Sequence, residues 1–236
     1  PKFCRCGLRE IFTFIAIALC SIVSPDGLTA AGRPHVLFIA IDDLNHWLGH
    51  LQRNDQAITP NLDRLAARGV SFANAYCAAP ACNPSRAALM SGMRPSTTGV
   101  YHNPHDYRPH IKPEQTLNSH FRANGYYVAG AGKIYHQGGG RLEDWDDYGE
   151  RGNVKSEGVY EQEAVGALKW AQLKGGDEVV NDYHTVSYCI DQLNRPQSNP
   201  LFLACGIFRP HLPWNVPKKY FDLHPLESIK LPPYQA

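Results

Sequence analysis

The first candidate functional residues in this sequence are two adjacent carboxylates. Asp42 and Asp43 follow directly on the apolar run 35–41. Neighbouring carboxylates repel each other unless a cation lies between them, and carboxylate oxygens are the ligands that hard ions such as Ca²⁺ or Mg²⁺ prefer. The pair therefore indicates either a cation site or two solvated turn residues, and the two residues alone do not decide between these.

A second candidate is the segment Cys-Asn-Pro-Ser-Arg at positions 82–86. Pro84 favours a helix start, so Cys82 lies near the positive end of the helix, and Arg86 falls at i+4 on the same face. This environment predicts a nucleophilic thiolate with a low pKa, and the alternative is a buried Cys in a helix-capping loop. A chance match to C-x-P-S-R in a chain of this length is on the order of one in a thousand, which favours the reactive interpretation.

Two further segments carry basic side chains. Lys133 and His136 lie in GKIYH, and His211 lies in RPHLPW. Without further information, Lys133 and His136 are explained as parts of a solvated loop at a strand end. His211 is equally explained as a turn residue between two prolines.

The elements that must position these residues follow from the hydrophobic pattern. The runs HVLFIAI at 35–41 and LFLACGI at 201–207 predict buried parallel strands. Strands that alternate with helices predict an α/β fold with a mainly parallel central sheet flanked by helices, whose ligand sites lie at the carboxyl ends of the strands. The other expected elements are helices from Thr59-Pro60 to Gly69, over 84–90, 117–123 and 182–193, short strands over 70–75 and 126–129, and surface loops over 136–160 and 210–233.

Composition narrows the class of protein. The chain has 236 residues, 43% of them hydrophobic, with 23 basic and 22 acidic side chains. The apolar content predicts a folded core, and the near-zero net charge argues against binding nucleic acid through bulk charge. There is no C-x-x-C and no zinc-type spacing, and we expect Cys77, Cys189 and Cys205 to be small buried apolar residues.

The first 31 residues have the pattern of a secretory signal peptide. A basic start precedes an uncharged apolar run over 11–23, which is shorter than the about 20 residues that span a bilayer. Small residues follow, and cleavage is expected after Ala30 or Ala31. This predicts a periplasmic or secreted protein without stable membrane association after cleavage.

Four segments in this order resemble the type I sulfatases of the alkaline-phosphatase superfamily. They are PHVLFIAIDDL, TPNLDRLAARGVSFANAY, ACNPSRAALMSGMRPSTTGVY and GYYVAGAGKIYH. The later stretch FRPHLPWNVPKKYFDLHPLESIKLPP is most similar to the iduronate-2-sulfatase group and its bacterial relatives. The resemblance covers about residues 34–236.

The resemblance implies a sulfuric ester hydrolase that acts on a sulfated glycan. It implies that a formylglycine-generating maturation enzyme oxidises Cys82 to Cα-formylglycine, whose hydrate attacks sulfur with one hydroxyl and expels sulfate with the other. Asp42, Asp43 and the oxygen at position 82 would bind one Ca²⁺. The resemblance also gives roles to four side chains: Arg86 orients the hydrate, Lys133 binds sulfate, His136 deprotonates the hydrate, and His211 contacts the leaving-group oxygen as a general acid.

Some features depart from the family. Asn83 stands where small residues are commoner, and Val128 where a hydroxyl residue is commoner. The family's remaining metal ligands and a second sulfate-binding Lys have no counterpart, so residues 32–236 are expected to be a truncated, N-terminal portion of the catalytic domain. Two alternatives stay open: a phosphonate monoester hydrolase or phosphodiesterase of the same superfamily, and a truncated non-catalytic remnant.

Overall fold

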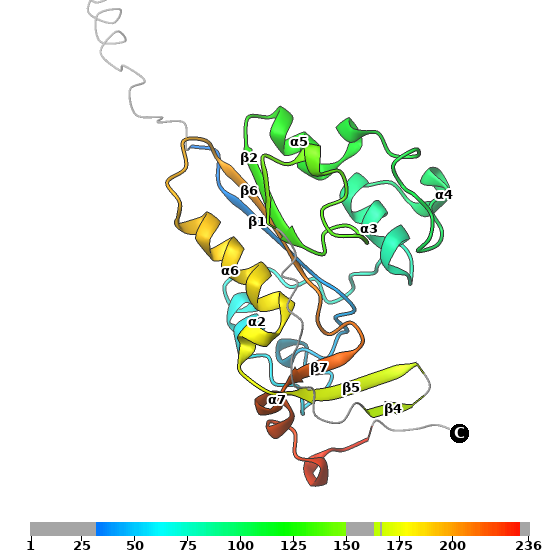
Figure 1. Ribbon diagram of the computed structural model, residues 1–236, viewed down its shortest axis with the longest axis vertical. Coiled ribbons are helices and arrows are strands. Elements are labelled where there is room, and N and C mark those ends of the chain that lie inside the picture. The colour runs from blue at the N-terminus through cyan, green and yellow to red at the C-terminus, as the bar shows by residue number, and fades with distance from the viewer. Residues whose placement is uncertain (1–31, 150–162, 166, 232–236) are drawn as a thin grey trace, which may run out of the picture. The chain divides into compact units, whose positions relative to one another are not determined.

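Four parallel strands form the main sheet, in the order β1-β6-β2-β3 (Figure 1). The computed structural model describes residues 32–149, 163–165 and 167–231, so the expected signal peptide lies outside the described residues. The strands are β1 (Val36–Ile41), β6 (Leu201–Ile207), β2 (Tyr127–Gly132) and β3 (Asp147–Gly149). The predicted α/β fold with a mainly parallel sheet is therefore confirmed.

The central strands are apolar on both faces because both faces are covered. In β6, Phe202 and Ala204 contribute to one buried cluster, whereas Leu203 and Cys205 contribute to the other. This alternation follows from side chains pointing to opposite faces along a strand. Helices α3 (Cys82–Ser91) and α5 (Leu117–Ala123) cover the first face, and α6 (Asn181–Asn194) covers the second (Figure 1).

A smaller sheet has the order β4-β5-β7. Strand β5 (Leu168–Leu173) pairs antiparallel with β4 (Glu163–Val165) and parallel with β7 (Trp214–Pro217). The short helix α7 (Lys218–Asp222) follows β7 directly. This sheet was not predicted from the sequence, and β7 lies within the stretch expected to be a surface excursion.

Several expected elements match the structure closely. Helix α2 (Pro60–Ala66) begins at the predicted Pro, and α5 and β6 have the predicted bounds. Thr59 Oγ1 does not cap α2, because it accepts a hydrogen bond from the Gly49 N–H at 2.8 Å instead. A further short helix, α4 (Pro95–Thr98), follows α3.

Other expectations were wrong. Residues 70–75 form no strand: they pair with no described strand, and Val70 and Phe72 are largely exposed. The segment 136–149 is not only surface loop, because it supplies β3 and the buried Trp145. Residues 150–160 of that predicted loop lie outside the described residues.

The cysteines divide between core and surface. Cys189 and Cys205 are buried as expected, whereas Cys77 is exposed and the prediction for it was wrong. No helix in the described ranges has both the length and the apolar character required to cross a bilayer.

Candidate active site

The carboxyl ends of three parallel strands bring the predicted residues to one edge of the main sheet. Register pairs Ile41 with Ile207 and Gly132 with Gly206, so β1, β6 and β2 end together. The residue after β1 is Asp42, whose N–H donates to the Ile207 carbonyl at 3.0 Å. The residue after β2 is Lys133, whose N–H donates to the Gly206 carbonyl at 2.9 Å.

Two glycines make this close approach of backbone possible. Gly132 has φ +80°, a conformation that favours glycine, where the chain turns out of β2. At Gly206, a Cβ would overlap the backbone of Lys133. The absence of side chains at both positions therefore allows Lys133 to lie over the end of β6.

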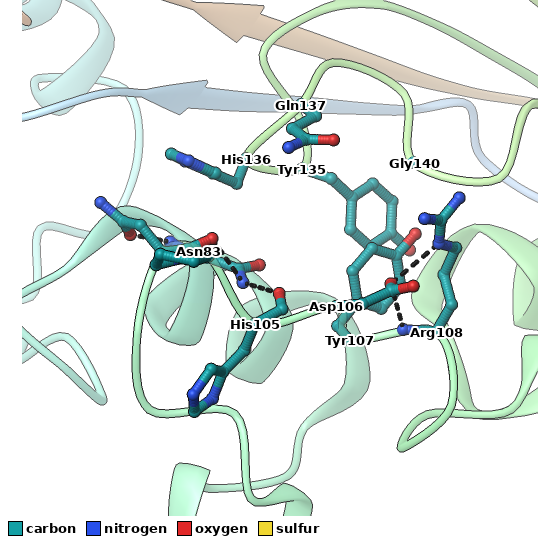
Figure 2. Close-up of a pocket in the computed structure, with 11 residues that line it drawn as sticks. Asn83, His105, Asp106, Tyr107, Arg108, Tyr135, His136, Gln137 and Gly140 are labelled. Carbon is teal, nitrogen blue, oxygen red and sulfur yellow. Dashed lines mark hydrogen bonds and ion pairs between the residues drawn. The ribbon is translucent and has the colours of Figure 1, made fainter.

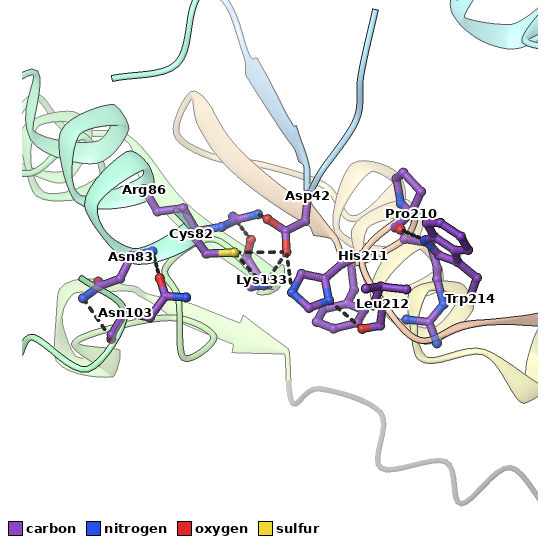
Figure 3. Close-up of polar contacts among 12 residues, drawn as sticks. Asp42, Cys82, Asn83, Arg86, Asn103, Lys133, Pro210, His211, Leu212 and Trp214 are labelled. Carbon is purple, nitrogen blue, oxygen red and sulfur yellow. Dashed lines mark hydrogen bonds and ion pairs between the residues drawn. The ribbon is translucent and has the colours of Figure 1, made fainter. Parts of the chain in front are cut away.

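Asp42 is the centre of the polar contacts (Figure 3). Its Oδ1 accepts a hydrogen bond from Arg86 Nη2 at 2.8 Å, and its Oδ2 accepts one from Lys133 Nζ. His211 Nε2 lies 4.0 Å from the same Oδ2. Burial acts to raise the pKa of the Asp42 carboxyl, but the hydrogen bonds from Arg86 and Lys133 outweigh it and hold this pKa below its usual value. Asp42 is therefore an ionised carboxylate held between two cations.

Cys82 faces this cluster from the first residue of α3. Its Sγ lies 3.7 Å from Lys133 Nζ and 4.0 Å from Asp42 Oδ2. Burial raises the pKa of the Cys82 thiol, and the charges of Asp42 and Asp43 add to this effect, against the opposing effect of Lys133. The predicted low-pKa thiolate is therefore wrong, because burial and two carboxylates outweigh the ammonium group of Lys133.

Arg86 connects three parts of the site. Besides Asp42, it reaches the chain after β2, where its Nη1 donates to the carbonyls of Lys133 and Ile134, the latter at 3.1 Å. The side chains of Arg86, Asp42 and Lys133 are only 5–7% exposed. The spacing of Cys82 and Arg86 by one helical turn lets α3 deliver both to the same cluster.

His211 is positioned by the turn that follows β6. Asp182, in the first turn of α6, accepts hydrogen bonds from the backbone N–H groups of Phe208 and Arg209 at 2.7 and 2.8 Å. The His211 Nδ1 lies 2.6 Å from the Leu212 carbonyl. Because a carbonyl can only accept, Nδ1 carries a hydrogen, and Nε2 is the nitrogen that faces Asp42.

The remaining two predicted residues lie outside this contact cluster. Asp43, with φ +56°, shares with Asp42 and Cys82 the lining of a hollow of about 560 Å³. His136 lines a neighbouring hollow of about 220 Å³, and its buried Nδ1 has no partner among the described residues. Burial, followed by the charge of Lys133, lowers the pKa of His136.

The donor atoms around Cys82 suit a hard cation. Asp42 and Asp43 offer carboxylate oxygens to the same hollow, and an oxygen at position 82 would add a third ligand of the same type. His211 lies close enough to Asp42 and Cys82 to complete an alternative set of donors. Arg86 and Lys133 already satisfy Asp42, so a cation bound here would share that carboxylate with them.

Asn83 has a structural role that the sequence did not reveal. Its buried side-chain amide lies within hydrogen-bond distance of the carbonyls of His102, Asn103 and His105, at 3.2, 3.3 and 2.6 Å. Its backbone N–H donates to Asn103 Oδ1 at 3.0 Å. Asn83 therefore fastens the 102–105 loop to the start of α3 (Figure 3). The only available signal was a polar residue at a position where small ones are commoner.

Comparison with known proteins identifies the family of the chain. The family model described as Sulfatase matches residues 34–224. The chain belongs to the sulfatase family. A sulfatase from Formosa agariphila is 39% identical over 229 residues, which cover 86% of this chain and 44% of the relative. Iduronate 2-sulfatase from Mus musculus is 30% identical over 227 residues, which cover 88% of this chain and 40% of the relative.

Solved structures of other proteins show the same fold. A 2-O GAG sulfatase is 27% identical with a TM-score of 0.54, over 75% of this chain and 35% of that chain. The phosphonate monoester hydrolase from Silicibacter pomeroyi has a TM-score of 0.63 at 19% identity, over 85% of this chain and 46% of that chain, and this likeness concerns the fold alone. This sulfatase-family chain spans less than half the length of the curated relatives described above.

Proposed function

We propose that this sulfatase-family hydrolase removes sulfate from a sulfated glycan, with residue 82 as nucleophile after oxidation of Cys82 to formylglycine. The supporting observation is the placement of the Cys82 Sγ beside Lys133 Nζ and Asp42 Oδ2 in one buried cluster. A glycan substrate of the iduronate-2-sulfate type is motivated by the iduronate 2-sulfatases among the relatives.

The cationic side chains would hold the sulfate. Lys133 Nζ lies 3.7 Å from the atom at position 82 that would become the nucleophile, so its ammonium group would contact the oxygens of a sulfate being attacked there. Arg86 holds Asp42 and the chain after β2 in place, which keeps Lys133 directed toward the nucleophile. Both roles depend on charge that burial protects from screening by salt.

Two histidines would move protons at different atoms. His211 Nε2, which faces the cluster, would protonate the oxygen of the leaving sugar. His136 has a lowered pKa and is therefore a neutral imidazole near pH 7, which suits the acceptance of a proton from the hydrated residue 82.

Asp42, Asp43 and the oxygen at position 82 would bind one Ca²⁺. A cation bound there would polarise the sulfate ester and favour the deprotonated form of the nucleophile. Carboxylate oxygens around the hollow support a hard cation, and the nearness of His211 makes a competing donor set the alternative to test.

The biological setting that we propose follows the sequence. Residues 1–31 would direct export to the periplasm or the outside of the cell, and a formylglycine-generating enzyme would mature Cys82 during synthesis. Residues 32–236 would form the N-terminal portion of the catalytic domain.

A comparison of hydrolysis rates on different esters tests this function. Protein made together with a maturation enzyme, in its native length, should release sulfate from a 2-O-sulfated iduronate disaccharide and from 4-nitrocatechol sulfate in preference to phenyl phosphonate monoesters. Cys82→Ala is the control that separates this turnover from contaminating hydrolases. Faster hydrolysis of the phosphonate ester would replace the sulfatase proposal by the phosphonate alternative, and no turnover of any of these esters would support a non-catalytic remnant.

A further inference from the structure

A side hollow of about 220 Å³ is lined by Asn83, the residue that follows Cys82 in the chain (Figure 2). We call it the side hollow, and the lining residues used below are Asn83, Asn103, Asp106, Arg108, His136 and Gln137. Its lining residues are Asn83 and residues from the segments 103–108 and 135–140. None of these residues makes one of the contacts around Asp42 described above.

The side hollow and the larger hollow lined by Cys82 share one lining residue. Asn103 lines both of them, and Asn83 follows Cys82 directly in the chain. His136, on the opposite wall, is three residues after Lys133. For a substrate with its sulfate at Cys82 and Lys133, the way from the larger hollow to the side hollow would pass Asn103.

Two stacked and buried aromatic rings form part of the wall of the side hollow. The rings of Tyr107 and Tyr135 stack with centroids 5.0 Å apart and an interplanar angle of 11°, and both side chains are buried. The Tyr135 hydroxyl donates a hydrogen bond to Asn118 Oδ1 at 2.9 Å. The guanidinium group of Arg141 lies 5.6 Å from the Tyr107 ring. A ligand that packs against these two already packed rings would cost little entropy of ordering them.

Arg108 and Asp106 present unused hydrogen-bonding groups at this wall. Arg108 Nε donates to Asp106 Oδ1 at 2.8 Å, and the Arg108 backbone N–H donates to the same oxygen at 3.0 Å. Within the described residues, the two Nη groups of Arg108 and the Oδ2 of Asp106 have no hydrogen-bond partner. The pair is therefore oriented by its own contacts and keeps paired donors and an acceptor for neighbouring hydroxyls or for a carboxylate.

We propose that the side hollow is the subsite for the sugar residue that is glycosidically linked to the sulfated one, with Arg108 and Asp106 as its main polar contacts. This inference rests on the proposed sulfatase function. It makes the enzyme selective for a sulfated disaccharide or longer glycan over a sulfate ester that ends at the reacting oxygen.

Equilibrium binding tests the subsite without turnover. In a Cys82→Ala background at native length, Arg108→Ala should weaken binding of a 2-O-sulfated iduronate–glucosamine disaccharide about tenfold, which corresponds to about 1.4 kcal/mol. Calorimetry with inorganic sulfate on the same proteins should show a much smaller change. Arg64→Ala, which removes an exposed arginine on α2, is the matched control and should leave both affinities unchanged.

Kinetics on the matured enzyme then separate the two proposals. Arg108→Ala should lower the ratio of kcat/KM for the disaccharide to that for 4-nitrocatechol sulfate by about tenfold, again about 1.4 kcal/mol. An unchanged ratio, together with unchanged disaccharide affinity, would overturn the subsite while leaving the sulfatase function intact. If the parent enzyme hydrolyses neither ester, the sulfatase proposal fails, and the binding experiment alone decides whether the side hollow takes a sugar. Thermal unfolding of Arg108→Ala close to that of the parent protein excludes misfolding as the cause.

Discussion

Asp42 and Lys133 form a buried ion pair across the end of β6, the strand that lies between β1 and β2. Asp42 follows β1 and Lys133 follows β2, and β6 lies between these strands in the sheet. Gly206 of β6 has no side chain to separate the two. The charge centre of the site is therefore also a contact that fixes the spacing of three strands.

Removing the charge of Asp42 should destabilise the fold. Asp42→Asn leaves Arg86 and Lys133 buried without a counter-charge, and loss of one partner of a buried pair costs about 3–5 kcal/mol. Urea denaturation of the whole protein measures the free energy of unfolding. The control is Asp222→Asn, which removes the partner of Lys218 in an exposed pair and should change stability by about 0–1 kcal/mol. Equal effects of the two substitutions would contradict the buried charge centre.

Oxidation of Cys82 should change the mass of the peptide that contains it. Its pKa is raised by burial, so the unmodified thiol is a weak nucleophile and activity should depend on conversion. Mass spectrometry of the peptide containing residue 82, from protein made with a maturation enzyme, should show the loss of one sulfur and two hydrogens and the gain of one oxygen, as the CH₂–SH group becomes an aldehyde. Cys82→Ala should remove sulfatase turnover and leave the unfolding midpoint near that of the parent. A persistent thiol in fully active protein would refute the formylglycine proposal.

Replacing Asn83 should loosen the 102–105 loop. Asn83→Ala removes an amide that satisfies carbonyl groups of this loop, and buried groups left without a partner cost about 1–3 kcal/mol. Hydrogen exchange should become faster in peptides spanning residues 101–106, with little change in peptides of β6. Asn124→Ala, at the end of α5, provides a comparison at an exposed asparagine. Unchanged exchange in the loop would show that Asn83 does not hold it.

The pKa of His136 gives stability a definite dependence on pH. Burial, followed by the charge of Lys133, lowers this pKa from 6.5. The charge of Asp42 opposes this shift, and the charges of Arg86 and His211 add to it. The unfolded chain then binds more protons, so stability should be fully present above about pH 6.5 and should fall as the pH drops through that value toward the folded pKa. Unfolding midpoints between about pH 5 and pH 8 measure the effect. His136→Gln should flatten the curve, whereas His224→Gln, at an exposed histidine, should not.

The outer edge of β1 should promote self-association of residues 32–236 expressed alone. Among the described strands β1 has a neighbour on one side only, and Leu37 and Ile39 are each 48% exposed. An apolar edge of this kind invites pairing with another chain. Light scattering should show aggregation that Ile39→Lys reduces, whereas Val70→Lys, at an apolar residue outside any strand, should not reduce it. A monomeric parent fragment with sulfatase turnover would contradict this prediction.

The elements predicted correctly from the sequence are those whose own residues carry a clear hydrophobic pattern. Strands β1 and β6 are continuous apolar runs, and the helix at 117–123 has clear bounds. Strand β3 was not predicted because it has only three residues, Asp147–Gly149, and its burial depends on β2 beside it. The small sheet likewise depends on pairing between residues far apart in the chain, which no local pattern reveals.

Most of the predicted site residues lie together in the fold, whereas the prediction of their electrostatics was less accurate. The resemblance named Asp42, Cys82, Arg86, Lys133 and His211, which the fold brings together. The raised pKa of Cys82 depends on two carboxylates and on burial, neither of which the helix start alone indicates. The contacts of Asn83 with the 102–105 loop also require the folded chain.

The position of Arg86 has a consequence for how the protein fails on heating. One guanidinium group joins α3 to the end of β1 and to the chain after β2, all within the buried interior. Opening the site would have to break these hydrogen bonds as α3 separated from the end of the sheet. Heat inactivation and loss of the folded state should follow a single curve, with no temperature range in which an inactive but folded protein accumulates.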